Sequence, residues 1–304
     1  MVKINWNYYT YNVNSNFFKN WDSKRAYVLG FTCADGNVHE ATLAWDLSDK
    51  SDSNLQLLKQ INIALHSNYP IEKRQNSYRL RISNKIILDD IKKLGIIPNK
   101  SKVLEFPNVP DQFLRDFVRG FLDGDGWITV RSRDNGVNEI SVGFSGASVV
   151  FMEKLVSKLD QQVSLSSHHL RERKKKSARG INSKYFQLDY YSKNAFNLIK
   201  YLYDDLKEGD LYLDRKFQKQ ITARKIYLEY SLKSKAFREK ELESGKEMKD
   251  ILNELMFKKG LDGIQIAKEL NVHSSTIYRW LEKTDVRKPA IRGSEEWKQR
   301  VYRN

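Results

Sequence analysis

Apolar residues at helical spacing begin the first patterned region of the chain, and alternating apolar residues follow. Residues 28–36 read Val-Leu-Gly-Phe-Thr-Cys-Ala-Asp-Gly, an apolar run that predicts a helix ended by the final Asp-Gly. The pattern that follows predicts four further elements: a strand-like run at 38–47, a helix at 54–65, a hairpin at 69–82 and a helix at 83–94. We expect Ser83 to cap the last helix and Gly95 to close it.

The same series then begins again. Residues 118–126 read Val-Arg-Gly-Phe-Leu-Asp-Gly-Asp-Gly, so that Asp125 takes the place of Asp35, 90 positions earlier. The predicted elements are strands at 127–133 and 139–144 about a turn at 134–136, a helix at 149–159, strands at 168–173 and 185–191, and a helix capped by Ser192. Two tandem αββαββα repeats, about 20–110 and 111–231, predict an α+β fold with one pseudo-twofold domain over residues 1–231.

A separate all-α unit is predicted at the end of the chain. Residues 232–246 are charged and predict a linker helix or hinge, and residues 247–304 form the small domain and tail. Within it, helices at 264–270 and 274–283 flank a short turn, with Ser274 or Ser275 as the expected cap. The expected buried positions are Ile264, Ala267, Leu270, Val272, Ile277 and Trp280. This pattern favours a helix-turn-helix, whose second helix reads the DNA major groove, over a helical bundle for protein contacts. The candidate contacts are Ser274, Ser275, Thr276, Tyr278 and Arg279.

The repeated motif predicts a metal site. Small residues recur four apart in each copy, at Gly30 and Ala34 and at Gly120 and Gly124, so the two helices can pack closely. Close packing would bring Asp35 and Asp125 together beside the unpaired carbonyls of both helix ends. Without a cation such a pair is repulsive, whereas Mg²⁺ accepts few carboxylates together with carbonyls and waters. A metal held there can activate water and stabilise the leaving oxygen of a phosphodiester.

The charge composition of the chain indicates a polyanionic partner. The 304 residues carry a formal net charge of +15, and the excess is shared by the regions before and after residue 231. Such an excess favours nucleic acid, with a solvated basic surface as the plainer alternative. A mean hydropathy of −0.64 and the lack of a long apolar run argue against a membrane span. The N-terminus lacks an apolar signal core and Cys33 is the single cysteine, so we expect a reducing, cytoplasmic location.

The paired motifs resemble those of the LAGLIDADG homing endonucleases in their single-chain, two-motif form, over about residues 20–230. The resemblance implies a saddle of strands lying along the major groove. It implies a monomer that cuts both strands of a specific double-stranded DNA site with Mg²⁺ or Mn²⁺. By the same resemblance Asp35 and Asp125 are the metal-binding acids, and the carbonyls of Ala34 and Gly124 join them. Lys100 and Lys216 match the basic residue near each catalytic centre, where a lysine stabilises phosphate charge or orients the attacking water.

Basic residues on the predicted strand faces fit DNA contact. Arg79 and Arg81 share one face while Leu80 and Ile82 share the other, and an arginine can bind guanine through two hydrogen bonds. The expected contacts on the two repeats are Arg74, Arg79, Arg81, Arg131, Arg133, Arg171, Arg173, Lys174 and Lys184.

The first motif departs from the pattern, and two other functions stay open. Cys33 stands where the second copy has Asp123, which predicts unequal half-sites and a weaker strand-cutting step at the first motif. We expect Cys33 to be a packed residue rather than a reactive thiol. One alternative is a DNA-binding regulator that keeps the fold without catalysis. The other is a maturase that binds its host intron RNA, in an organelle if the host gene is organellar.

Overall fold

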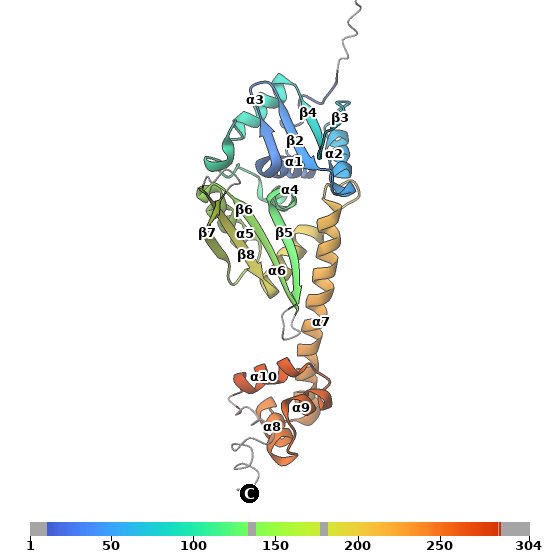
Figure 1. Ribbon diagram of the computed structural model, residues 1–304, viewed down its shortest axis with the longest axis vertical. Helices are drawn as coiled ribbons and strands as arrows, with labels where there is room; N and C mark the ends of the chain where they lie inside the picture. Colours follow the sequence, from blue (N-terminus) through green and yellow to red (C-terminus); the bar gives the residue numbers. More distant parts are fainter. Residues whose placement is uncertain (1–10, 133–137, 177–181, 285, 287–304) are drawn as a thin grey trace, which may run out of the picture. The chain divides into compact units, whose positions relative to one another are not determined.

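The structure is a computed structural model that describes residues 11–132, 138–176, 182–284 and 286. The chain divides into two compact units, described separately below: one holds residues 1–129 and 140–224, the other residues 130–139 and 225–304 (Figure 1). Within the described residues, no helix combines the length and the apolar character needed to cross a membrane.

The first repeat forms a four-stranded sheet with three helices. Its elements are α1 (Ser23–Asp35), β1 (Gly36–Val38), β2 (Leu43–Ser48), α2 (Asp52–Ala64), β3 (Ile71–Lys73), β4 (Ser77–Ile82), α3 (Lys85–Lys93) and a 3₁₀ turn (Lys100–Lys102). The sheet order is β1-β2-β4-β3, and neighbouring strands are antiparallel. The run at 38–47 is therefore two strands and not one, because the His39 amide donates to the Thr42 carbonyl at 2.8 Å and closes a turn.

The second repeat follows the same order. Its elements are a 3₁₀ turn (Asp111–Phe113), α4 (Leu114–Asp125), β5 (Gly126–Ser132), β6 (Asn138–Gly146), α5 (Val149–Gln162), β7 (His169–Lys176), β8 (Asn182–Tyr191) and α6 (Ser192–Tyr203). The sheet order β5-β6-β8-β7 matches that of the first sheet. The α+β fold with two four-stranded antiparallel sheets is thus confirmed; the expected turn at 134–136 lies outside the described residues.

Two helix caps differ from the sequence prediction. Asn84, not Ser83, caps α3, and its side chain accepts from the Ile87 amide at 3.1 Å. The Ser83 hydroxyl instead donates to the Ala41 carbonyl, which ties the end of β4 to the loop before β2. Ser192 is the first residue of α6, and Tyr191 is its N-cap. Because Tyr191 also ends β8, the strand passes directly into the helix.

Glycine permits the close approach of α1 and α4 at the centre of this unit. A Cβ atom on Gly30 would lie 1.9 Å from the Phe117 carbonyl oxygen, and one on Gly120 would lie 2.1 Å from the Tyr27 carbonyl oxygen. No side chain fits at such distances, so backbone meets backbone at both points. Most of the helix pair is buried, and the sheets and the other helices of both repeats contribute further core residues. The sheets supply, among others, Leu80, Ile82, Leu188 and Tyr190.

From residue 225 onward the described part of the second unit is helical. α7 (Asp214–Ser244) leads into it, and α8 (Met248–Asn253), a π-helical turn (Glu254–Lys258), α9 (Gly263–Glu269) and α10 (Ser274–Lys283) follow. Of the predicted buried positions, Ala267, Leu270, Ile277 and Trp280 lie in the core of this unit. Val272 is partly buried and packs against this core, and Ile264 is exposed. Ile264 is 68% exposed because it lies in the first turn of α9, whereas Ile266, Ala267 and Leu270 face the core. The cap of α10 is His273 rather than a serine, since its ring Nδ1 accepts from the Ser275 amide.

Candidate active site

The two motif aspartates lie at the adjoining ends of α1 and α4. Each helix ends at its aspartate, and a glycine follows it in an extended conformation. A Cβ atom on Gly124 would lie 2.3 Å from the Ala34 Cβ and 3.3 Å from Asp35 Oδ2. The Asp35 carboxylate therefore lies against the backbone of the partner helix, one residue before Asp125. The close packing of small residues thus brings the two acids into one site.

Burial penalises the ionised forms of both acids. It raises the pKa of Asp35, and it raises that of Asp125 to about 6. For Asp125 the negative charge of Asp35 is the second cause of the higher pKa, while Lys100 and Lys216 act in the opposite direction. Desolvation and a like charge both penalise ionisation, so the site favours a cation between the two carboxylates.

Two buried lysines flank the acids in matching positions. Lys100 stands in the 3₁₀ turn after α3 and is 7% exposed, and Lys216 stands in the first turn of α7 and is 3% exposed. Each ammonium donates to the carbonyl of the glycine after a motif aspartate, Lys100 to Gly36 and Lys216 to Gly126 at 2.8 Å. Burial lowers the pKa of both groups, that of Lys216 to about 8. The lysines so place positive charge beside the acids without a direct ion pair.

The donor set suits a hydrated divalent cation. Among the residues that the structure describes, no group of three His, Cys, Asp or Glu side chains is gathered as a metal cage. Two carboxylates remain, with the carbonyls of Ala34 and Gly124 next to them in the chain. Mg²⁺ keeps several waters and takes one or two carboxylates, so this sparse, oxygen-only set fits it better than it fits zinc.

Ser145 adds a contact that the sequence pattern did not single out. Its hydroxyl donates to the Asp125 carbonyl at 3.0 Å and so satisfies one of the last carbonyls of α4. Ser145 lies on β6, which pairs with β8 in the second sheet. The alternation of β6 would place Ser145 on the outer face, but only the folded sheet brings that face to the end of α4.

Acidic residues hold the predicted DNA-contacting arginines of the first sheet. Arg79 Nε donates to Asp46 at 2.6 Å across the β2–β4 pair, where the two residues are in register. Arg74 and Arg81 lie 3.1 and 3.6 Å from Glu72 on β3. The arginines are thus held on the outer face, and the prediction had not included the two acids. Strand alternation could have found both, because register partners share a face.

The second sheet repeats this arrangement with a buried acid. Arg171 donates to Asp189 at 2.7 Å and to the Tyr191 hydroxyl at 3.3 Å. Asp189 also accepts from the Gln187 amide at 2.9 Å, and its side chain is only 3% exposed. The other predicted contacts on this sheet are exposed, namely Arg131, Arg173, Lys174 and Lys184, the last within 3.1 Å of Glu172. Arg133 lies outside the described residues.

The predicted contacts of α10 are unequal in exposure. Ser274, Ser275, Thr276 and Arg279 are half-buried, and Tyr278 is 40% exposed. The Tyr278 ring packs on Gly263, where a Cβ atom would lie 2.8 Å from it. The Ser275 hydroxyl lies 2.8 Å from the His273 ring. Tyr278 and Ser275 therefore have structural contacts within the unit in addition to any role at a surface.

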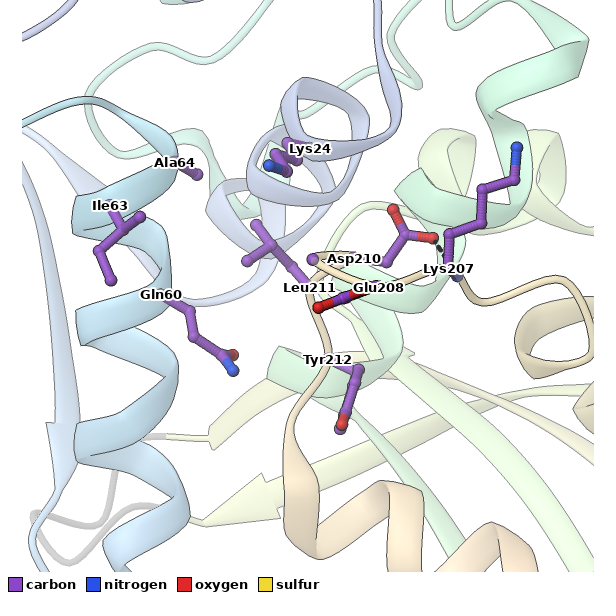
Figure 2. A pocket seen from close by; sticks show the side chains of 10 residues that line it. Lys24, Gln60, Ile63, Ala64, Lys207, Glu208, Asp210, Leu211 and Tyr212 are labelled. Carbon is purple, nitrogen blue, oxygen red and sulfur yellow. Dashed lines mark hydrogen bonds between the residues drawn. The ribbon is translucent and has the colours of Figure 1, made fainter.

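A hollow of about 370 Å³ lies between α1, α2 and the loop before α7. Figure 2 shows the side chains that line it, with Lys24 from α1, Gln60 and Ile63 from α2, and Tyr212 from the loop. The loop is tied down by Asp210, which accepts from the Ser23 hydroxyl at 3.1 Å and from the Lys207 amide at 2.9 Å. The motif aspartates are not among the lining residues, so the hollow is a feature separate from the paired acids.

Comparisons with known proteins give a low similarity to DNA-bound nucleases. No protein-family model and no curated protein matches the sequence. The meganuclease I-SmaMI, bound to uncleaved DNA in the presence of calcium ions, is 13% identical, with a TM-score of 0.44 over 71% of this chain and 93% of that chain. The LAGLIDADG homing endonuclease I-GzeII, in complex with its DNA target, is 13% identical, with a TM-score of 0.43 over 73% and 92%. The LAGLIDADG meganuclease I-AabMI, bound to uncleaved DNA, is 11% identical, with a TM-score of 0.46 over 70% and 93%. At such identities the side chains of the site, and not the overall similarity, carry the functional argument.

Proposed function

We propose that this chain is a site-specific DNA endonuclease that hydrolyses phosphodiester bonds in both strands of a duplex with a divalent metal. One observation carries the proposal. Two half-buried carboxylates meet at the ends of α1 and α4. Each is flanked by a buried lysine that donates to the backbone carbonyl of the glycine following that aspartate. Such a concentration of buried, mutually repelling charge is unfavourable for folding and typical of a catalytic site.

Asp35 and Asp125, with the carbonyls of Ala34 and Gly124, would hold Mg²⁺ or Mn²⁺. The bound cation supplies a water made acidic enough to act as nucleophile, and charge stabilisation at the leaving oxygen. The raised pKa of both acids supports this role, because a bound cation would offset the penalty that burial places on their ionised forms.

The two lysines supply fixed positive charge. With a pKa of about 8, Lys216 is mostly protonated at neutral pH, so it acts as an electrostatic group and not as a general base. Its ammonium is held by backbone carbonyls and needs no rearrangement to face developing negative charge on a phosphate. Lys100 takes the corresponding part in the first repeat.

DNA contact is assigned to the outer faces of both sheets and to α10. The paired arginines Arg79 and Arg171 are oriented by acids, which supports base reading, and the exposed Arg131, Arg173, Lys174 and Lys184 suit phosphates. In the second unit, Ser274, Ser275, Thr276, Tyr278 and Arg279 are the proposed contacts of a helix-turn-helix that extends the footprint. Both halves of the catalytic site come from one chain, which supports action as a monomer.

The test begins with selection of cleavable sites from a randomised duplex library by the wild-type protein in Mg²⁺. On a selected site, Asp35→Asn and Asp125→Asn should abolish cleavage while affinity for the duplex changes only a few-fold. The control is Asp89→Asn, an exposed carboxylate on α3, which should cut normally. Binding of Mn²⁺ alone, followed by electron paramagnetic resonance, should be lost in the two site variants and kept in the control.

Three results would contradict the proposal. Cutting of both strands by either site variant would remove the acids from the mechanism. A wild-type protein that binds a duplex site and never cuts it would be a regulator. Tighter filter binding of structured intron transcripts than of duplex DNA would make it a maturase.

The contribution of α10 has its own measurement. Replacing Ser274 and Thr276 together by alanine should change the bases selected at one end of the site if the helix reads bases. Unchanged selection with uniformly weaker binding would make the second unit an anchor only.

A further inference from the structure

One buried contact breaks the pseudo-twofold relation between the repeats. The offset that relates Asp35 to Asp125 also relates Gly30 to Gly120, whose backbone contacts are reciprocal. By the same offset, Tyr27 corresponds to Phe117, and Cys33 corresponds to Asp123. The Tyr27 hydroxyl donates to Asp123 Oδ2 at 2.6 Å across the helix pair. The mate positions, Phe117 and Cys33, are both buried and have neither the hydroxyl nor the carboxylate.

The polar contact also fixes the start of α7. Asp123 Oδ2 accepts a second hydrogen bond, from the Leu213 amide at 2.8 Å. Leu213 immediately precedes α7, and the Lys216 amide donates back to the Leu213 carbonyl at 2.9 Å. The Lys216 ammonium in turn donates to the Asp123 carbonyl at 2.8 Å. Asp123 thus holds the helix start by its side chain and the lysine by its backbone.

Lys100 is held with fewer contacts in the first repeat. Among the described residues its ammonium donates to the Gly36 carbonyl, whereas Lys216 donates to three carbonyls, those of Leu122, Asp123 and Gly126. Cys33 stands where Asp123 would be, and burial raises the pKa of its thiol to about 12, so it carries no charge. Lys100 therefore has no counterpart of the Tyr27–Asp123 bridge behind it.

Packing alone does not explain why the bridge is polar. Within the described part of the chain, Asp123 Oδ1 and the Tyr203 hydroxyl are buried without a hydrogen-bond partner. Each such atom is unfavourable for folding, because it has lost its hydrogen bonds to water and gained none in the protein. The same chain fills the mate positions with Phe117 and Cys33, so an apolar solution is available to this interface. The polar contacts fix orientation, which an apolar contact does less well.

We propose that Tyr27 and Asp123 are positioning residues that hold Lys216 rigidly and so make the two catalytic centres unequal, with one DNA strand cut faster than the other. The proposal rests on the proposed endonuclease function. A charged group held in place before the reaction stabilises the transition state better than one that must be ordered, and displacement by about 1 Å can cost up to ~100-fold in rate. The centre that uses Lys216 is therefore the faster one.

The test measures the two strands separately. A selected duplex labelled at both 5′ ends is cut under single-turnover conditions by the full-length protein. The wild type should cut the strands at different rates. Tyr27→Phe removes one oxygen atom and places at position 27 the residue type found at the equivalent position of the second repeat, Phe117. This variant should therefore fold. It should slow the faster strand on the order of tenfold and leave the slower strand within about twofold.

Controls separate positioning from general damage. Phe117→Tyr adds a hydroxyl at the mate position and should leave the ratio of strand rates unchanged. Hydrogen exchange of the amides from Leu213 to Lys216 should accelerate in Tyr27→Phe, and this readout does not depend on cleavage. Equal slowing of both strands, or an unchanged ratio, would overturn the proposal while the endonuclease function stands. A wild type that cuts no duplex of the randomised library would overturn the endonuclease function itself, whatever the exchange rates.

Discussion

The sharpest consequence of the paired acids is that removing one of them should stabilise the metal-free protein. Asp125 is half-buried, and the charged groups that face it are Asp35, Lys100 and Lys216. Burial and Asp35 together raise its pKa from 3.8 to about 6 despite the two lysines. A shift of that size corresponds to about 3 kcal/mol of differential free energy between the ionised and neutral forms. The change Asp125→Asn removes the charge and keeps the shape.

The direction of the pH effect on stability follows from the number of protons that the folded and unfolded states bind. A carboxyl whose pKa is raised in the folded state costs nothing at pH values below its unfolded value of 3.8, where both states are protonated. Between 3.8 and about 6 the folded state binds more protons than the unfolded state, so stability falls as the pH rises. Above this window the full cost is present. Asp125→Asn should therefore raise the free energy of unfolding at neutral pH by up to about 3 kcal/mol.

The assay is urea denaturation followed by intrinsic fluorescence in the presence of EDTA. Wild type and Asp125→Asn should differ near neutral pH and converge near pH 4, and the control Asp89→Asn should match the wild type throughout. Added Mg²⁺ should stabilise the wild type more than the variant, because the cation binds the folded site only. A variant that is no more stable than the wild type near neutral pH, or whose advantage persists unchanged near pH 4, would refute the electrostatic reasoning.

Three further predictions concern packing, capping and DNA contact. Gly30→Ala would place a Cβ atom 1.9 Å from the Phe117 carbonyl oxygen, so α1 and α4 must separate. Thermal denaturation should show that the free energy of unfolding falls by about 3 kcal/mol or more. A decrease below about 1 kcal/mol would contradict this close approach. His273→Ala removes the cap of α10 and should destabilise this helix by about 1 kcal/mol. Amide exchange in the first turn of α10 should then be faster than in the wild type, while the melting temperature of the first unit stays unchanged. Exchange as slow as in the wild type would mean that the His273 ring does not cap the helix. Arg79→Ala should weaken duplex binding and relax the base selected at one position of the site, while leaving Asp46 unpaired. Unchanged base selection would assign Arg79 to Asp46 alone.

The local pattern of the chain predicted the elements well and their ends less well. Helical spacing at 54–65 and alternation at 78–82 correspond to α2 and to most of β4, because both patterns depend on neighbours a few residues apart. Caps were harder to place, since Ser83, Ser192 and Ser274 are all good capping residues by type. In each case a neighbouring residue is the N-cap instead. Asn84 caps α3, Tyr191 at the end of β8 precedes α6 directly, and His273 caps α10.

The repetition of a motif also allowed the main feature of the site to be inferred without coordinates. Two Asp-Gly endings with small residues four apart predict two helices that touch, and the structure places Asp35 against Gly124. Lys100 and Lys216 could be named through the resemblance of the motifs to a known family, which implies a basic residue near each centre. What they bind could not be named, since Lys216 and Gly126 are distant in sequence and meet only in the folded unit.

Sequence periodicity assigns a side chain to a face of a helix or strand, and here that was enough for the α+β class, the repeat and the pair of acids. It does not say which atom of another element lies within 3 Å. The acids that hold Arg79 and Arg171, and the bridge from Tyr27 through Asp123 to Lys216, depend on such distances. A hydrogen bond weakens within a few tenths of an ångström, so these contacts follow from the packing of α1 against α4 and the register of the sheets, and from no local pattern.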